Sequence, residues 1–504
     1  MSDVKHVPDI MEVITDLSND EVRTPPKTAN LILDLLPQDV WSNSSYRWFD
    51  PGVKSGVFLR EAAKRLMVGL AEEFPDQEMR ITHILTNQLF GAAVTELSSL
   101  MSRRALYCSK HPNSSDSVVV FPDERGNIWH NRTAHRFING RCSECKAGQK
   151  EFGTLKDENH AYGFLHENGR REISEVMNMN FDIIIGNPPY QMSVPGSSDI
   201  PLYQHFVAQA KKLNPRYISF VIPARWYAGG KGLDEFRAEM LSDRRIRKLH
   251  DYMKAQDVFP TMNADFEGGV CYFLWDRDNP GLCESYICDQ TTQLGPFIRE
   301  LDELDVFVRD IRALEILRKI QKKTKATVES LTTGQTPFGF YSNFKNYEDK
   351  ESSNSVKLFV NIGGKRSEKW VKRAQVVKGK DLVDQWKLLI PEAYGERGAV
   401  PSMVLGPMLV SPPGTCCTQT YLAFGPFDDE TTVLNFQSYM QTKLARFLVS
   451  LRKISQHAGR MTYSFVPLLD FSQKWTDSEL QKYFGLESEE ISYIESVIRE
   501  FPKS

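Results

Sequence analysis

One short stretch of this sequence combines residues that could hold a planar amine. Asn187, Pro188, Pro189 and Tyr190 follow directly after the apolar run 181–186. Proline fixes its own φ at about −65° and restricts the residue before it, so the two prolines stiffen the loop. The Asn187 side-chain oxygen and the Pro188 carbonyl are two acceptors for the two protons of one amine, and Tyr190 offers an aromatic face.

This combination suits the exocyclic amine of adenine. That amine is a poor nucleophile because its lone pair is delocalised into the ring. Two acceptors would favour the pyramidal nitrogen that develops as the amine attacks, and the tyrosine would stack on a base rotated out of a duplex. The alternative is a strand that ends in a proline-stiffened turn with a surface tyrosine, although a strand followed directly by Asn-Pro-Pro-Tyr is a fairly specific signal.

The segment before this loop has the pattern of a buried strand. Residues 181–186 are apolar apart from Asp182 and end in Gly186, which is typical of a parallel strand covered on both faces. Strands alternating with helical segments predict an α/β fold with a doubly wound, mostly parallel sheet, in which ligands bind at the carboxyl ends of strands. Further strands are predicted at 216–223, 246–252 and 269–275.

A second motif lies at residues 48–59. It predicts a strand through Asp50, a tight turn of small residues and an amphipathic helix that extends to about Leu70. Such a turn lets a ligand approach the backbone, and the helix amino terminus offers free amides. The motif matches neither the dinucleotide G-x-G-x-x-G pattern nor a P-loop, and a purely structural turn is the alternative.

Together the two motifs resemble the amino-group DNA methyltransferases that make N6-methyladenine. The motif order is similar to their gamma group, which includes the methylase part of Eco57I-type restriction-modification enzymes, and the resemblance covers roughly residues 20–290. It implies a Rossmann-like methyltransferase fold, S-adenosyl-L-methionine as cofactor and double-stranded DNA as substrate. It also implies a catalytic role for Asn187, Pro188, Pro189 and Tyr190. The cofactor contacts that it implies are Arg23, Thr24, Pro25, Asp50, Gly52, Ser55, Gly56 and Phe58.

Two positions depart from the family pattern. Lys54 stands where the family usually has a glycine, so the turn of the first motif is expected to be reshaped. Ala93 stands where an acid usually binds the cofactor ribose, and Glu96 follows three residues later. Glu96 either substitutes for that acid or caps or solvates the helix that it opens. Both departures concern the cofactor contacts more than the fold.

Cysteines and histidines gather between residues 107 and 152, a predicted insertion in the α/β domain. Cys142-x-x-Cys145 followed by Gly148 resembles a zinc knuckle. A small insertion with few apolar residues gains stability when a metal ion crosslinks it. Free thiols are the alternative, and redox chemistry is a weaker one, because no thioredoxin-like strand and helix surround the motif. The predicted ligands of a structural Zn²⁺ are Cys108, His135, Cys142 and Cys145, with His111 or His130 as substitutes.

The predicted domains are a methyltransferase domain at 1–299, a helical connector at 300–330 and an α+β target-recognition domain at 331–504. The last has basic residues interleaved with aromatic ones, which suits phosphate contacts and stacking. Solvated charged faces and a glycine-rich surface loop are the alternatives. The predicted DNA contacts are Arg225, Trp226 and Lys231 in the first domain, and Lys365, Arg366, Lys369, Lys372 and Arg373 in the last.

Composition is that of a globular chain without unusual bias. The net charge of −3, from 62 Lys and Arg against 65 Asp and Glu, requires that any DNA-binding face come from local clustering. No apolar run is long enough to span a membrane and no signal-peptide core precedes the first motif. Eight cysteines in 504 residues do not form a disulfide scaffold. We therefore expect a cytoplasmic protein.

The sequence thus predicts a site-specific DNA adenine-N6 methyltransferase of a restriction-modification or phage or host DNA modification system. No nuclease motif is found, so a restriction endonuclease partner is expected to be a separate chain. One rival is a protein glutamine-N5 methyltransferase, because Asn-Pro-Pro-Tyr also occurs in enzymes that methylate amides. The other is a DNA-recognition protein that has lost methylation, which Lys54 and Ala93 make conceivable.

Overall fold

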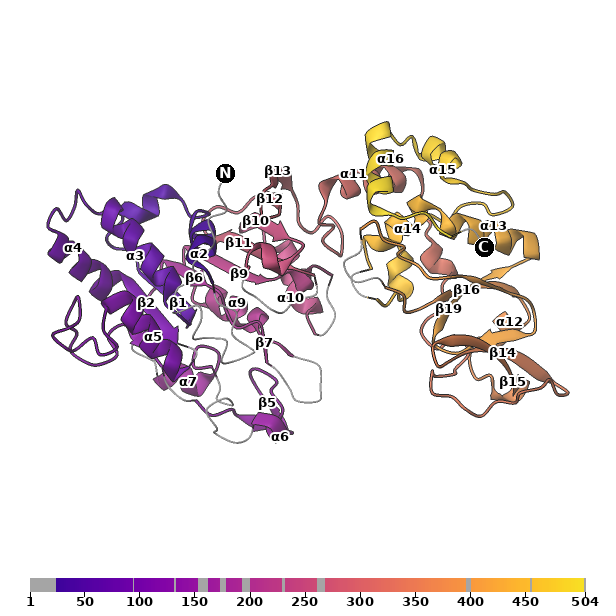
Figure 1. Cartoon of the computed structure of the whole chain (residues 1–504), viewed down its shortest axis with the longest axis horizontal. Coiled ribbons are helices and arrows are strands. Elements are labelled where there is room, and N and C mark those ends of the chain that lie inside the picture. Colours follow the sequence, from indigo (N-terminus) through magenta and orange to yellow (C-terminus); the bar gives the residue numbers. More distant parts are fainter. Residues whose placement is uncertain are drawn as a thin grey trace, which may run out of the picture. The chain divides into compact units, whose positions relative to one another are not determined.

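The computed structural model describes residues 24–93, 95–130, 133–152, 162–172, 178–192, 200–228, 232–260, 268–395, 400–453 and 456–502. They form two compact units that divide between Phe307 and Val308 (Figure 1). Among these residues, no helix combines the length and the apolar character needed to cross a bilayer.

A nine-stranded sheet organises the first unit, with the strand order β13-β12-β10-β11-β9-β6-β1-β2-β3. The strands from β9 to β3 are mutually parallel, β11 is antiparallel to its two neighbours, and β10 and β12 run parallel to each other. The predicted α/β fold with a large, mostly parallel sheet is confirmed. The strands are β1 (Trp48–Val53), β2 (Leu89–Ala93), β3 (Ile128–Trp129), β6 (Ile183–Gly186), β9 (Tyr217–Pro223), β10 (Ile246–Tyr252), β11 (Val270–Asp276), β12 (Cys283–Cys288) and β13 (Gln293–Arg299).

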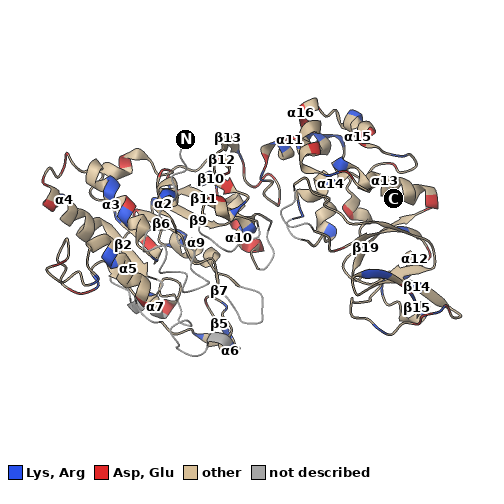
Figure 2. Cartoon of the chain, in the orientation of Figure 1, with Lys and Arg blue, Asp and Glu red and all other residues tan. Residues whose placement is uncertain are grey.

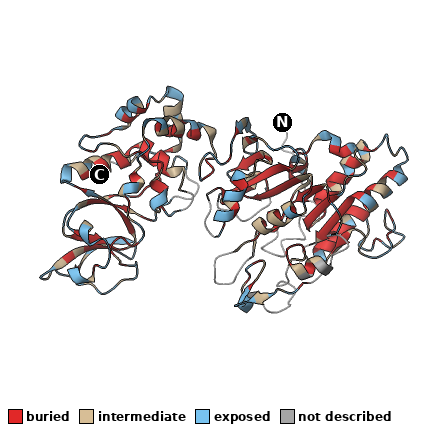
Figure 3. Ribbon diagram, turned by 180° about the vertical axis from the view of Figure 1, so that it is seen from behind, coloured by how far each residue is buried: buried red, intermediate tan, exposed pale blue. Residues whose placement is uncertain are grey.

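Both faces of this sheet are covered, because side chains alternate between two hydrophobic cores. Trp48 and Ile183 belong to one core, whereas their neighbours Phe49 and Ile184 belong to the other. Figure 3 shows the strands as buried and the helices as buried along one side. The helices α2 (Pro26–Leu33) and α3 (Val57–Gly69) contribute to the first core, and α9 (Tyr203–Lys212) and α10 (Asp234–Ser242) contribute to the second.

The remaining elements of the first unit are further helices and two short strand pairs. The helices are α4 (Gln77–His83), α5 (Glu96–Tyr107), α6 (Gln149–Phe152) and α7 (Glu167–Glu172). The strand pairs are β4 (Phe137–Ile138) with β5 (Arg141–Cys142), and β7 (Gln191–Met192) with β8 (Ile200–Pro201). The predicted insertion and the segment after it pack on the same core as α9, because Cys142, Cys145 and Phe164 belong to that core.

The second unit contains two three-stranded sheets and several helices. One sheet has the order β15-β14-β18 and the other the order β17-β16-β19. The strands are β14 (Ser355–Ile362), β15 (Lys365–Lys372), β16 (Trp386–Pro391), β17 (Leu409–Ser411), β18 (Thr415–Cys417) and β19 (Tyr421–Phe427). The helices are α11 (Ile311–Lys323), α12 (Lys380–Val383), α13 (Glu430–Gln441), α14 (Lys443–Ser450), α15 (Asp477–Phe484) and α16 (Ser488–Val497).

Candidate active site

The two motifs meet at the carboxyl edge of two adjacent parallel strands. In the register of β1 and β6, Trp48 pairs with Ile183 and Phe49 pairs with Ile184. Asp50 therefore continues β1 beside the end of β6, and Asn187 follows β6 directly. Parallel strands end at the same edge, which is where ligands bind in open α/β sheets.

Two glycines allow this close approach. A Cβ atom on Gly186 would lie 2.6 Å from Asp50 Oδ1, and the φ of +150° at Gly186 is one that other residues rarely adopt. A Cβ atom on Gly52 would lie 3.4 Å from Pro188 Cα and from Pro189 Cδ. Gly52, near the end of β1, and the loop after β6 thus lie close together.

A third motif joins them through one hydrogen bond. The Asn187 Nδ2 donates to Thr24 Oγ1 at 3.0 Å, and both side chains are buried. Thr24 lies two residues before α2, next to Pro25 at the N-cap position of this helix. Arg23, the other residue predicted in this motif, lies outside the described residues. The hydrogen bond sets the orientation of the Asn187 amide, with its oxygen on the side away from Thr24.

Asp50 has an altered acidity. Its carboxyl is buried, which raises its pKa from 3.8 to about 7. The backbone N–H of Gly52, which donates to Asp50 Oδ1 at 3.0 Å, and the charge of Lys54 act in the opposite direction. The Asp50 carboxyl therefore has a pKa close to neutral pH, and shifted pKa values of this kind are frequent at functional sites.

The turn after β1 leads directly into α3. Gly56 has φ +75° and is the residue before the helix, and a Cβ atom there would lie 3.0 Å from Ser102 Cα. Only glycine combines this left-handed backbone with so close a contact. Ser55 is half-buried in the turn, and Phe58 is buried in the core against which α3 packs.

Glu96 is exposed in the first turn of α5. The cap of this helix is not Glu96 but Thr95, whose side chain accepts a hydrogen bond from Ser98 N, while Ser98 Oγ accepts one from Thr95 N. Capping by Glu96 is therefore wrong, and contact of Glu96 with a ribose stays a prediction.

Tyr190 is buried rather than exposed. Its ring is 2% exposed, makes an edge contact with Phe259 at 6.5 Å, and has Lys54 Nζ at 6.0 Å from its centroid. Burial raises the pKa of its hydroxyl well above the usual value. The stacking of Tyr190 on a base stays a prediction, and in this structure the ring packs in the core.

Among the described residues, four metal-ligating side chains cluster in the insertion. The ligand atoms of His135, Cys142, Cys145 and His166 all lie within 4.8 Å of one another. Three of the four predicted zinc ligands are thus brought together. The fourth position belongs to His166 and not to the predicted Cys108, which is exposed at the carboxyl end of α5.

The predicted DNA contacts of the first unit are only partly accessible. Trp226 is fully buried in this structure, with ring contacts to Tyr227 at 4.6 Å and to Phe236 at 6.0 Å, and its contact with DNA stays a prediction. The Trp226 side chain, which follows the buried strand β9, packs in the hydrophobic core. Arg225 is half-buried, and Lys231 lies outside the described residues.

The predicted DNA contacts of the second unit lie on or directly after β15. Lys365, Arg366 and Lys372 are exposed. Lys369 forms an ion pair with Asp349, and Arg373 forms one with Asp384. Basic and acidic residues are interspersed on both units (Figure 2).

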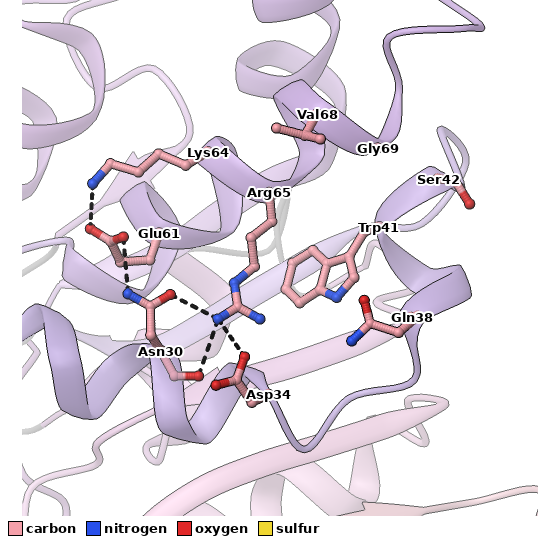
Figure 4. A pocket seen from close by; sticks show the side chains of 10 residues that line it. All are labelled: Asn30, Asp34, Gln38, Trp41, Ser42, Glu61, Lys64, Arg65, Val68 and Gly69. Atoms are coloured by element: carbon pink, nitrogen blue, oxygen red, sulfur yellow. Dashed lines mark hydrogen bonds and ion pairs between the residues drawn. The ribbon is translucent and has the colours of Figure 1, made fainter.

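A hollow of about 500 Å³ lies apart from these residues, and it is lined by Asn30, Asp34, Gln38, Trp41, Ser42, Glu61, Lys64, Arg65, Val68 and Gly69. Figure 4 shows Arg65 between Asp34, Asn30 and Trp41. The guanidinium pairs with Asp34 at 2.7 Å and lies 5.0 Å from the Trp41 ring centroid. These charges satisfy one another, which favours a structural role for the hollow.

The sequence is related to known methylases. The family model of the Eco57I restriction-modification methylases matches residues 87–259, a span that includes Asn187. An uncharacterized adenine-specific methylase of Mycoplasma pneumoniae (strain ATCC 29342 / M129 / Subtype 1) is 34% identical over 301 residues, which are 54% of this chain and 71% of the relative. The chain belongs to this family of methylases. The resemblance predicted from two motifs is thereby confirmed.

Two solved structures match the chain at low identity. The first is a nuclease-deletion mutant of the Type ISP restriction-modification enzyme LlaGI in complex with a DNA substrate mimic, with a TM-score of 0.48, 12% identity and coverage of 89% of this chain and 46% of that chain. The second is the Type IIL restriction-modification enzyme MmeI in complex with DNA, with a TM-score of 0.46, 12% identity and coverage of 88% and 65%. This chain spans less than two thirds of either.

His166 is the site residue that sequence reasoning missed. It lies 21 positions after Cys145, outside the predicted insertion 107–152, and no fixed spacing connects it to the Cys-x-x-Cys motif. The signal that could have found it is compositional: His166 follows the apolar pair Phe164–Leu165, which predicts a buried histidine, and buried histidines need a partner.

Proposed function

We propose that this methylase transfers a methyl group from S-adenosylmethionine to the N6 amine of adenine in DNA. The observation that carries the proposal is the hydrogen bond from Asn187 to Thr24, at the strand edge where Asp50 also lies. It joins two motifs 163 positions apart, and the pairing of β1 with β6 places the third beside them. Family membership supports the methylase activity, and the site supports the chemistry of the acceptor.

Asn187 would act on the amine of the target base. Because its amide nitrogen donates to Thr24, the amide oxygen is the group oriented to accept a proton of that amine. The carbonyl of Pro188, the next residue in the stiff loop, would accept the other proton. Two acceptors stabilise the positive charge that develops on the attacking nitrogen. The loop is buried, so the base would rotate out of the duplex to reach it.

The residues at the end of β1 fit the charged part of S-adenosylmethionine. This cofactor supplies an electrophilic methyl group on a sulfonium. The buried Asp50 carboxyl is a suitable partner for a cationic ligand, because a nearby positive charge favours its ionised form. The left-handed Gly56 and the free amides of the first turn of α3 allow a ligand to approach the backbone. A Cβ atom on Gly52 would meet Pro188 and Pro189, so both sites lie along one edge of the sheet.

Transfer of labelled methyl from S-adenosylmethionine to unmethylated genomic DNA tests the proposal. Label is expected on N6 of adenine after digestion of the DNA to nucleosides. A protein substrate is assayed in parallel. Label on glutamine side chains would contradict the proposal in favour of amide methylation. Binding of DNA without label on any substrate would favour a recognition protein that has lost methylation.

The second unit would supply part of the DNA contact. Lys365, Arg366 and Lys372 are exposed on β15, and no described carboxylate pairs with them. We expect the triple change to alanine to lower DNA affinity by roughly 10- to 100-fold. It should also reduce the slope of log affinity against log salt by about 2–3, because a protein with fewer phosphate contacts releases fewer counterions from the DNA when it binds. Fluorescence anisotropy with a labelled duplex at several salt concentrations measures both quantities.

The matched control uses Lys369 and Arg373, which have the same charge but are already paired with Asp349 and Asp384. Their double change to alanine should alter DNA affinity less than the triple change. An equal or larger loss for the control would show that exposure on β15 does not mark the DNA contact.

The role in the cell is proposed from the family. The Eco57I family comprises restriction-modification methylases, and we infer that the methyl mark protects DNA from a restriction endonuclease on a separate chain. DNA methylated by this protein should then resist such an endonuclease, and unmethylated DNA should be cut.

A further inference from the structure

The His/Cys cluster has the arrangement of a metal site. Cys142 Sγ lies 3.5 Å from His166 Nε2, and Cys145 Sγ lies 3.3 Å from His135 Nδ1. Zinc bonds of about 2.0–2.3 Å in a tetrahedron place the ligand atoms roughly 3.3–3.8 Å apart. The two distances fall in this range, and all four atoms lie within 4.8 Å of one another. One central ion can therefore reach all four.

The donor set selects the metal. Two thiolates and two imidazoles in a closed tetrahedral arrangement are typical of structural zinc. Cys142, Cys145 and His166 are almost fully buried and His135 is half-buried, so four protein ligands would complete the tetrahedron without a water or a substrate. A closed site of this kind stabilises structure and does not activate a ligand.

Neighbouring groups orient the ligands. His166 Nδ1 donates to the Tyr162 carbonyl at 2.8 Å, which leaves Nε2 to face the cluster. Such a bond to the second ring nitrogen is usual for histidines that bind metal. Around the cysteines, Lys146 N donates to the Cys142 carbonyl at 3.2 Å and Cys142 N donates to the Ala147 carbonyl at 2.8 Å. This tight turn, with φ +65° at Lys146, brings the two sulfurs to one side.

We propose that His135, Cys142, Cys145 and His166 bind one structural Zn²⁺, and that this ion fixes the insertion against the part of the core that supports the active site. The site uses one ligand that the sequence motif did not indicate, His166, and it excludes Cys108. It is independent of the methyl-transfer chemistry proposed above.

The path from the ion to the active site runs through Phe164, two residues before His166. The Phe164 ring stacks on Phe206 of α9 at 5.6 Å and contacts Phe49 at 5.7 Å. Phe49 is the residue before Asp50 in β1. The helix α9 follows Leu202, whose backbone N–H donates to the Tyr190 carbonyl at 3.0 Å. Phe164, two residues from His166, thus packs against the residue before Asp50 and against the helix that follows the Asn187–Tyr190 loop.

Metal analysis of the full chain tests the proposal. The protein is purified without a histidine tag or chelator and measured by inductively coupled plasma mass spectrometry. About one zinc per chain is expected, in keeping with one four-ligand site. Co²⁺ in place of zinc should give the visible absorption of tetrahedral cobalt together with a sulfur-to-cobalt charge-transfer band. Removal of the ion with a chelator should lower the Tm by roughly 5–10 °C, and zinc should restore it.

Two variants test which residues bind the metal. A third tests whether a loss of zinc results from misfolding. His166→Ala is expected to lose most of the zinc, whereas Cys108→Ser, the matched control, is expected to retain it. His166→Cys should retain zinc and give a cobalt spectrum with a stronger charge-transfer band, which shows folding with an altered ligand set. The proposal is overturned if the chain stays free of zinc after incubation with excess metal, if iron occupies the site, or if Cys108→Ser loses zinc and His166→Ala does not.

Discussion

Replacing Asn187 with alanine is expected to lower the rate of methyl transfer by at least about 10²- to 10³-fold, the loss seen when one preorganised group that stabilises transition-state charge is removed. The physical reason is the position of the amide: it is buried at the end of β6 and oriented by its hydrogen bond to Thr24. Single-turnover transfer of labelled methyl to DNA measures the chemical step, and titration calorimetry measures S-adenosylmethionine affinity, which should change little.

Two other variants separate chemistry from structure. Thr24→Val removes the oxygen that accepts the Asn187 hydrogen bond but keeps the shape of the side chain, and it should lower the rate by about tenfold. Asn127→Ala removes an asparagine whose amide donates to the carbonyls of Leu85 and Thr86, and it should lower Tm without a matching loss of rate. Retained activity in Asn187→Ala would refute the catalytic role of this residue.

Replacing Asp50 with alanine is expected to weaken S-adenosylmethionine binding by about 10- to 100-fold, the loss of one charge-assisted contact in a buried site. The carboxyl lies at the end of β1, against the backbone N–H of Gly52, where no solvent competes for it. Titration calorimetry with S-adenosylmethionine and with the neutral product S-adenosylhomocysteine measures the effect, which should be larger for the cationic ligand.

The pKa of Asp50 gives this prediction a pH dependence. Burial raises the pKa from 3.8 to about 7, so between these values the folded state binds one more proton than the unfolded state. Asp50 therefore contributes a stability that falls as pH rises from about 4 to 7 and is constant above that range. A cationic ligand selects the ionised form, so its affinity should increase about tenfold from pH 6 to pH 8.

Asp276 offers the matched control. It is also buried, but it pairs with Tyr217, the first residue of β9, and so lies at the opposite edge of the sheet. Asp50→Asn should abolish the pH dependence of cofactor binding, and Asp276→Asn should preserve it. If both variants keep the pH dependence, Asp50 does not contact the cation.

Local sequence determined the strands that carry the site. The apolar run at 181–186 and the apolar residues of β1 have no competing amphipathic pattern, so their conformation and their burial follow from composition alone. The same holds for the turn at Gly56, where a small residue before a helical pattern predicts a conformation that only glycine adopts easily. These signals were sufficient to predict the α/β fold and the family.

Tertiary structure decided how far the aromatic side chains of the motifs are exposed. Tyr190 and Trp226 have the residue types of base-contacting groups, yet both pack in the core, because burying a large aromatic surface is favourable wherever neighbouring elements supply a pocket. A residue type records what a side chain can do, but its exposure depends on elements distant in the chain. Phe259, which lies against the Tyr190 ring, is 69 positions away.

The metal cluster shows the same division. The Cys142-x-x-Cys145 turn is local, so its spacing alone predicts that the two cysteines lie together in the cluster. His135 and His166 lie 10 and 21 positions from Cys145, and their approach depends on how the insertion packs on the core. Cys108 was a reasonable candidate by type and distance, but it ends α5 on an exposed surface. Sequence by itself determined the family, the sheet and the chemistry of the motifs, because these depend on local pattern. Only the tertiary structure decided the hydrogen-bond partner of Asn187, the burial that raises the pKa of Asp50 and the fourth member of the His/Cys cluster, because each depends on how segments far apart in the chain pack together.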